Sequence, residues 1–159
     1  MDRKIFFGNV SEAIGHYQAL EKYFTTTSID PILRQLIKIR SSQINGCAYC
    51  LNMHTIDAFK IGETQQRMHL LNAWRETSLF TDKEKAVLDL VEKITLIHTH
   101  EVDKQTKDNV LKYFTEQEFS NIVVMIVTIN AWNRFFITLE SDIDHNYRYK
   151  NARRHLILD

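Results

Sequence analysis

Two cysteines and a histidine in one short segment are the residues of this chain best suited to chemistry. Cys47 and Cys50 are the only cysteines in 159 residues, and His54 follows four residues after the second. In a helix, steps of three, four and seven residues bring all three side chains to one face. The amides and dipole at a helix N-terminus favour a thiolate at Cys47, and an imidazole one turn below Cys50 can accept its proton. If one thiol is oxidised, the other can close a disulfide with it, which limits over-oxidation.

Two other uses of the cysteine pair stay open from the residues alone. A buried cysteine is a common small hydrophobic residue, so the pair could be structural. The pair could also bind zinc together with His54, His98 or His100. Structural zinc sites, however, usually take their second pair of ligands from another loop with its own close spacing. We therefore favour redox chemistry and predict no metal site.

The composition is that of an average soluble globular protein, and it disfavours several partners. Hydrophobic residues make up 44% of the chain and charged residues 25%. The formal net charge is zero, with 20 basic and 20 acidic side chains, which argues against a nucleic-acid partner. Residues 1–10 lack the apolar core of a signal peptide, and the apolar run 122–129 is too short to span a membrane. We expect a cytoplasmic protein with no membrane partner.

The segments that must position the cysteine pair are predicted to be helices. Four glycines and one proline leave few tight turns, which is typical of helices joined by short connections. Asp30 can cap a helix and Pro31 suits its first position, so a helix is predicted to run to about residue 42. A second helix follows over residues 47–61 and ends at Gly62, a residue type common just after helices.

Further helices complete an all-α fold. Capping boxes begin at Thr81 and Thr115 and mark two helix starts. The helix that follows Thr115, over residues 119–139, is apolar nearly all round, so we expect it to be the central and most buried element. Other predicted segments are helices over residues 1–28, 64–74 and 81–98 and a polar tail over residues 141–159. Because no linker interrupts the chain, we predict one compact helical domain over residues 1–159.

The residues around the cysteines resemble a known family. The stretch 36–54, LIKIRSSQINGCAYCLNMH, is similar to the signature of the carboxymuconolactone decarboxylase superfamily, in its alkylhydroperoxidase D-like (AhpD-like) branch. The resemblance continues at intervals to residue 134 and covers about residues 30–140. It implies a helical bundle that assembles into homo-oligomers, either trimers or hexamers. It also implies an activity that needs no cofactor, in which the cysteine pair reduces a peroxide substrate and a reducing thiol partner then restores the pair.

The resemblance also implies a role for each residue of the site. Cys50 would be the thiolate that attacks the peroxide, Cys47 the resolving thiol and His54 the proton acceptor. The helix dipole alone favours Cys47 as the more acidic thiol, whereas His54 is closer in register to Cys50. We favour Cys50, because a directly bonded base changes the thiolate population more than a partial charge does.

Two positions depart from the family pattern. That pattern has a glutamate twelve residues before the first cysteine, where this chain has Gln35, and an amide cannot accept a proton at neutral pH. Glu92 is our candidate for a substitute carboxylate, with a solvated helix charge as the alternative. Some family members have a histidine between the cysteines, where this chain has Tyr49, which is neutral at pH 7.

Two competing functions follow from these observations. The first is a helical zinc-binding or structural protein in which the cysteine pair does no chemistry. The second is a lactone decarboxylase-like enzyme, because the decarboxylases that give the superfamily its name share the fold implied here. Those decarboxylases, however, lack the cysteine pair. The presence of the pair favours a hydroperoxide-reducing enzyme over both.

Overall fold

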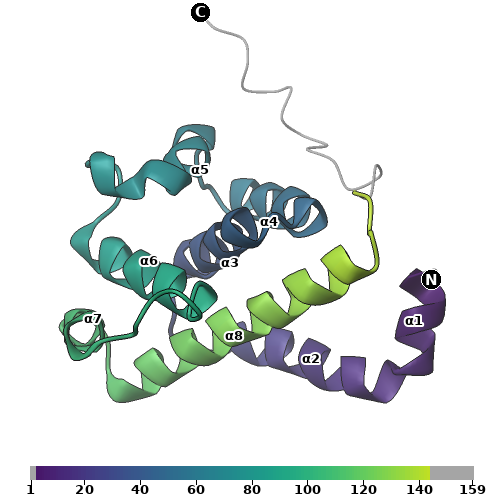
Figure 1. Ribbon diagram of the computed structural model, residues 1–159. Coiled ribbons are helices and arrows are strands. Elements are labelled where there is room, and N and C mark those ends of the chain that lie inside the picture. The colour runs from purple at the N-terminus through teal and green to yellow at the C-terminus, as the bar shows by residue number, and fades with distance from the viewer. Residues whose placement is uncertain (1–2, 144–159) are drawn as a thin grey trace, which may run out of the picture.

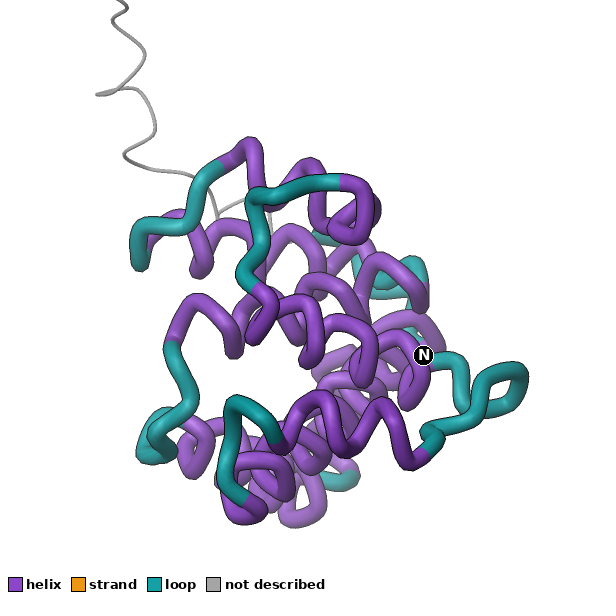
Figure 2. Tube along the Cα trace, turned by 90° about the vertical axis from the view of Figure 1, so that its left-hand side faces the viewer, coloured by secondary structure: helices purple, strands orange, loops and turns teal. Residues whose placement is uncertain are grey.

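The computed structural model describes residues 3–143, which consist of helices and connecting loops with no strand among them (Figures 1 and 2). The elements are α1 Arg3–Asn9, α2 Ser11–Phe24, α3 Pro31–Asn45, α4 Ala48–Lys60, α5 Gln65–Leu70, the 3-10 helix η1 Leu71–Glu76, α6 Asp82–Thr95, α7 Lys104–Leu111 and α8 Glu116–Thr138. The prediction of an all-α fold is confirmed. The predicted polar tail lies almost entirely outside the described residues, and assembly into an oligomer stays a prediction.

Helix α3 begins and ends where its sequence signals place it. The Asp30 carboxylate accepts hydrogen bonds from the backbone amides of Ile32 and Leu33, and Pro31 occupies the first turn. At the other end Gly46 has a φ of 71°, in the left-handed region that favours glycine. The chain therefore turns sharply after α3, and only Gly46 and Cys47 separate it from α4.

The two predicted capping boxes are both present. The Thr81 hydroxyl accepts a bond from the Glu84 amide, and the Glu84 carboxylate accepts one from the Thr81 amide. Thr115 and Glu118 form the same reciprocal pair at the start of α8. Each box satisfies two amides that would otherwise lack a partner at a helix N-terminus.

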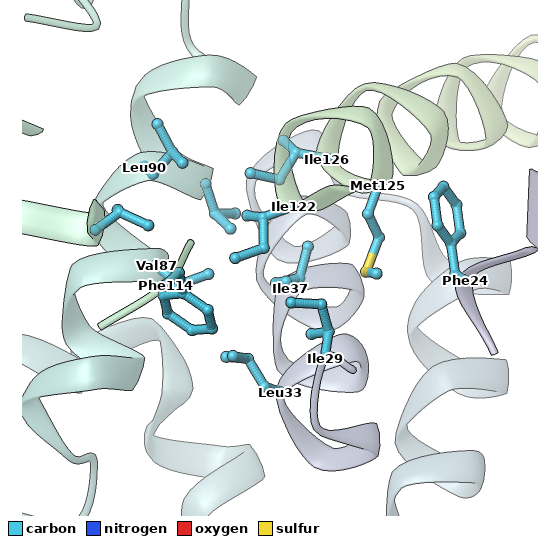
Figure 3. Packing of buried hydrophobic residues seen from close by; sticks show 12 residues of the cluster. Phe24, Ile29, Leu33, Ile37, Val87, Leu90, Phe114, Ile122, Met125 and Ile126 are labelled. Carbon is cyan, nitrogen blue, oxygen red and sulfur yellow. The ribbon is translucent and has the colours of Figure 1, made fainter. Parts of the chain in front are cut away.

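The core lies around α3, which packs against α4, α6 and α8. Figure 3 shows the larger cluster, in which side chains of α3, α6 and α8 meet together with Phe24 at the end of α2 and Ile29 from the connection before α3. Among its members Ile37, Val87 and Ile126 are fully buried. A second cluster on the α4 side of α3 includes Leu36 and Trp74. With a core on two sides, α3 can hold side chains in fixed positions for chemistry.

The structure corrects three expectations about the elements. Residues 1–28 were expected to form one helix, but α1 ends at Asn9 and a new helix, α2, starts at Ser11. Gly8 lies in the last turn of α1, where its conformational freedom weakens a continuous helix. Helix α7 was not predicted at all. It is mostly polar and buries only Thr106 and Val110, so its apolar periodicity is weak.

The third correction concerns α8. This helix packs in the core, yet Val124 and Val127 on its outer face are exposed, Val127 by 55%. The most enclosed position belongs to α3 instead, because α3 has neighbours on several sides. By length and composition α8 could also cross a membrane, a test that the core helix of a folded protein also passes.

Candidate functional site

The cysteine pair lies at the junction of α3 and α4. Cys47 is the N-cap of α4, and its sulfur accepts a hydrogen bond of 3.3 Å from the Cys50 amide. The two residues are joined by a disulfide, with their Cα atoms 5.4 Å apart. Both side chains are about 1% exposed. The sequence predicts Cys47 in the first turn of the helix, but Cys47 lies just before it, with an extended backbone, and from this N-cap position its sulfur bonds that of Cys50.

Amide side chains anchor the junction to α8. Asn45, the last residue of α3, donates hydrogen bonds of 2.9 Å to the side-chain oxygens of both Asn130 and Asn133. Asn133 is fully buried and donates in turn to the Ser42 hydroxyl at 3.0 Å. Buried amides need such partners, and these partners fix the end of α3 immediately before the cysteine loop.

His54 lies on the face of α4 that packs against α3, and Gln35 holds it there. The distance between His54 Nδ1 and Gln35 Oε1 is 3.1 Å. Because an amide oxygen only accepts hydrogen bonds, this contact places the imidazole proton on Nδ1 and leaves the Nε2 lone pair free. Burial, together with the smaller effect of the positive charge of Lys38, lowers the pKa of His54 from 6.5 to about 3. The imidazole is therefore neutral.

A cavity of about 310 Å³ opens beside His54 between α2, α3, α4 and α8; we call it the site cavity. It has the volume of a small-molecule site. Its lining residues are Gln18, Glu21, Gln35, Lys38, Cys50, Met53, His54, Asp57, Ile129, Trp132 and Phe136. Cys50 is among them and Cys47 is not, so the second cysteine faces the space that a substrate would enter.

An ion pair at the site cavity has no counterpart in the sequence predictions. The Lys38 ammonium on α3 contacts the Glu21 carboxylate on α2, and the two side chains are 11% and 28% exposed. The helical spacing that puts Lys38 one turn after Gln35 could have indicated a shared face. Nothing in the local sequence indicates Glu21, because it reaches the cavity from a separate helix.

Glu92 does not lie among the residues that line the site cavity. It accepts hydrogen bonds of 2.8 and 2.9 Å from Arg40 and from the Trp74 indole, and it also pairs with Arg75. Burial alone would raise the pKa of Glu92, but the bonds from Arg75 and Trp74 and the charge of Arg40 lower it. The carboxylate thus links α3, η1 and α6 and is held in its charged form.

Tyr49 lies behind the residues that line the cavity. Its ring stacks on that of Phe136, with centroids 4.2 Å apart, and Phe136 in turn stacks on Trp132. Aromatic rings of α1 and α2, including Phe7 and Tyr17, extend this cluster. Tyr49 therefore packs against residues that line the cavity, without being one of them.

The zinc alternative lacks a ligand set within residues 3–143. No group of three or more histidine, cysteine, aspartate or glutamate residues in that range could hold a metal ion. His98 and His100 are exposed in the turn that follows α6, where His100 contacts the Thr99 hydroxyl.

The sequence matches a known family and curated proteins. The model of a family described as the carboxymuconolactone decarboxylase family matches residues 10–93. The chain is also 45% identical over 120 residues to the uncharacterized protein YdfG of Bacillus subtilis (strain 168). That alignment covers 76% of this chain and 82% of YdfG.

Solved structures share the fold. A protein of unknown function from Agrobacterium tumefaciens, provisionally assigned as the antioxidant defence protein AhpD, superimposes with a TM-score of 0.84 and 30% identity. The match covers 91% of this chain and 99% of that one. The AhpD core of an uncharacterized peroxidase-related protein from Ralstonia eutropha JMP134 gives a TM-score of 0.78 at 15% identity, over 89% and 76% of the two chains. At that identity the second match shows the fold alone.

Proposed function

Because this chain belongs to the carboxymuconolactone decarboxylase family and has the AhpD-like fold, we propose that it reduces hydroperoxides through Cys47 and Cys50. The observation that carries the proposal is the disulfide between the two cysteines, with Cys50 and His54 lining one cavity. The description of the Agrobacterium tumefaciens protein as an antioxidant defence protein supports the same activity. The proposed compartment is the cytoplasm, where thiols are kept reduced.

In the first step Cys50 attacks the peroxide. Its thiol gives up a proton to Nε2 of His54, which Gln35 keeps available by fixing the tautomer. The thiolate attacks one peroxide oxygen, the O–O bond breaks, and the leaving alkoxide takes the proton from His54. A thiol and a hydroperoxide thus become a sulfenic acid and an alcohol. Because its pKa is depressed, the imidazole is a weak base that holds the proton only transiently between the thiol and the alkoxide.

In the second step Cys47 resolves the sulfenic acid. The Cys47 thiol attacks the sulfur of Cys50, a disulfide forms and water leaves. Two thiols of a reducing partner then restore the pair by thiol–disulfide exchange, through a mixed disulfide. The N-cap position of Cys47 suits this role, because the free amides of the first turn stabilise the thiolate released when the mixed disulfide forms on Cys50.

Thiol titration tests the proposal. Reduced protein is mixed with hydrogen peroxide or with an organic hydroperoxide, and free thiols are counted over time. We expect two thiols to be lost per chain for each peroxide consumed, with one alcohol and one water produced from an organic hydroperoxide or two waters from hydrogen peroxide. Cys50→Ser should abolish peroxide consumption, whereas Cys47→Ser should consume one equivalent and stop at the sulfenic acid. If wild-type thiols survive excess peroxide, the enzyme is not a hydroperoxide reductase.

The same variants separate the decarboxylase alternative. A lactone decarboxylase-like enzyme would keep its turnover in Cys50→Ser, because that reaction needs no thiol. A redox enzyme loses its turnover in this variant.

A further inference from the structure

Lys38 is a buried cation at the site cavity. It lies one helical turn after Gln35 on α3, and it lines the same cavity as Cys50 and His54. Glu21, from α2, pairs with its ammonium group and so holds the side chain on this side of α3. The Lys38 side chain is 89% buried, so little water screens its charge from neighbouring groups. Its electric field within the cavity is therefore strong.

The packing of α3 on α4 places Lys38 level with Cys50. The two helices are joined by two residues only, and the contact between Gln35 and His54 fixes their register. From the Gln35–His54 contact, one helical turn toward the connection between α3 and α4 leads to Lys38 on α3 and to Cys50 on α4. A cation beside a thiol favours the thiolate and lowers the thiol's pKa.

His54 is poorly placed to provide that cation. Its burial and the nearby positive charge of Lys38 both favour the neutral imidazole. A lasting imidazolium–thiolate pair would therefore need a second positive charge in a cavity that already holds one.

We propose that Lys38, held in position by Glu21, is the positive charge that stabilises the Cys50 thiolate. Glu21 is a positioning residue in this account, and His54 carries the proton without supplying the lasting charge. The inference rests on the proposed thiol chemistry at Cys50, and it needs no carboxylate at position 35, where this chain has Gln35.

The charges that face Cys50 can be named for each element around the cavity. Helix α2 contributes Glu21, α3 contributes Lys38, and α4 contributes His54 and Asp57. The lining residues of α8 are uncharged. Lys38 is the only cationic side chain among these lining residues, since His54 is neutral, so its removal should have the largest effect on the thiol.

Titration of Cys50 without any peroxide tests the inference. In a Cys47→Ser background Cys50 is the only thiol, and its thiolate is followed by ultraviolet absorbance as the pH is raised. We expect Lys38→Met to raise the midpoint by about one pH unit or more, the range typical for loss of an adjacent opposite charge. Lys38→Arg should keep the midpoint close to that of Lys38. Lys22→Met, which removes an exposed lysine next to Glu21 in sequence, is the matched control and should cause no shift.

A second variant covers the case in which Lys38→Met does not fold. Glu21→Gln removes an anion from the same cavity, while the amide oxygen can still accept a hydrogen bond from Lys38 and keep it in position, so the midpoint of Cys50 should move to lower pH. Unchanged midpoints in these variants would overturn the proposal, as would a shift seen only in His54→Gln. Because no peroxide is used, a shift can be observed even if the protein proves not to reduce hydroperoxides, and the two failures stay distinguishable.

Discussion

The contact between Gln35 and His54 sets the proton chemistry of the site at the scale of single residues. The amide oxygen accepts from Nδ1 and orients the ring, but it adds no negative charge. Burial then keeps the imidazole neutral. A carboxylate at position 35 would make the same hydrogen bond and would also stabilise the imidazolium. Gln35 instead orients the imidazole ring without stabilising its charged form.

The variant Gln35→Glu should therefore speed peroxide reduction at neutral pH. A carboxylate beside Nδ1 raises the pKa of His54, and each unit gained is worth about tenfold in proton affinity. We expect stopped-flow oxidation of the reduced protein to become faster by up to roughly tenfold. The control is Gln35→Met, which removes the hydrogen bond and should slow the reaction. An unchanged or lower rate in Gln35→Glu would show that His54 does not limit proton transfer.

The burial of neutral His54 should also make stability depend on pH. Its pKa is 6.5 in the unfolded chain and about 3 in the folded protein. Between these values the unfolded chain binds a proton that the folded protein does not, so stability is lost as the pH falls below 6.5. The loss amounts to at most about 1.4 kcal/mol for each pH unit.

Denaturant unfolding of the oxidised protein across this pH window measures the effect. His54→Gln removes the titrating group, so its free energy of unfolding should fall less steeply with acidification than that of the parent protein. Carboxylates such as Glu84 titrate in both proteins and cancel in the difference. Parallel curves would show that His54 is protonated in the folded protein well above pH 3.

At the scale of elements, the site depends on how α3, α4 and α8 are held together. The sharp turn at Gly46 brings α4 back against α3, and the amides of Asn45, Asn130 and Asn133 tie that turn to α8. The face of α8 that carries the amide cluster continues into Trp132 and Phe136, which line the cavity. One helix therefore both anchors the cysteine loop and shapes the space in front of it.

Removal of the buried amide at position 133 should loosen this arrangement. Asn133→Ala leaves the Ser42 hydroxyl and one bond of Asn45 without a partner, which costs about 1 to 3 kcal/mol of unfolding free energy. We also expect slower disulfide formation after peroxide addition, because the loop that carries Cys47 is less fixed. The control Asn109→Ala removes a surface amide on α7. It should change the unfolding free energy by no more than about 0.5 kcal/mol, and the rate of disulfide formation by no more than the corresponding factor. A wild-type rate of disulfide formation in Asn133→Ala would contradict an anchoring role.

The elements that could be predicted from sequence are those with strong local signals. Asp30, Pro31 and Gly46 bracket α3, and the threonine capping boxes mark α6 and α8. Helical register places Cys50 and His54 one turn apart on α4, and Cys47 adjoins them as the N-cap of the same helix. The Glu21–Lys38 pair and the position of Glu92 depend instead on how separate helices pack. Local spacing carries no information about such contacts.

At the scale of the whole molecule, polar networks lie on two sides of α3. The site cavity occupies one side, and on the other Glu92 joins Arg40 of α3 to Trp74 and Arg75 of η1. The Arg75 guanidinium continues to Asp89, so the ion pairs hold η1 against α6. The molecule thus separates a charged network that holds helices together from the residues suited to redox chemistry.

Replacement of Glu92 tests this division. Glu92→Gln leaves the largely buried Arg40 without its carboxylate, so we expect unfolding free energy to fall by roughly 1 to 3 kcal/mol, below the cost of breaking a fully buried pair. At temperatures where the variant is folded, its rate of thiol oxidation should equal that of the parent. A slower rate with unchanged stability would return Glu92 to a role in proton transfer.

The position of Trp132 gives the protein an optical property. The chain has two tryptophans, and only Trp132 lines the cavity that Cys50 faces, whereas Trp74 packs on η1 against the guanidinium of Arg75. Reduction and re-formation of the disulfide change the surroundings of the Trp132 indole. The surroundings of Trp74 stay the same, so Trp74 can serve as an internal reference. In Trp74→Phe protein the emission of a single fluorophore would follow each redox cycle in real time, without an added dye.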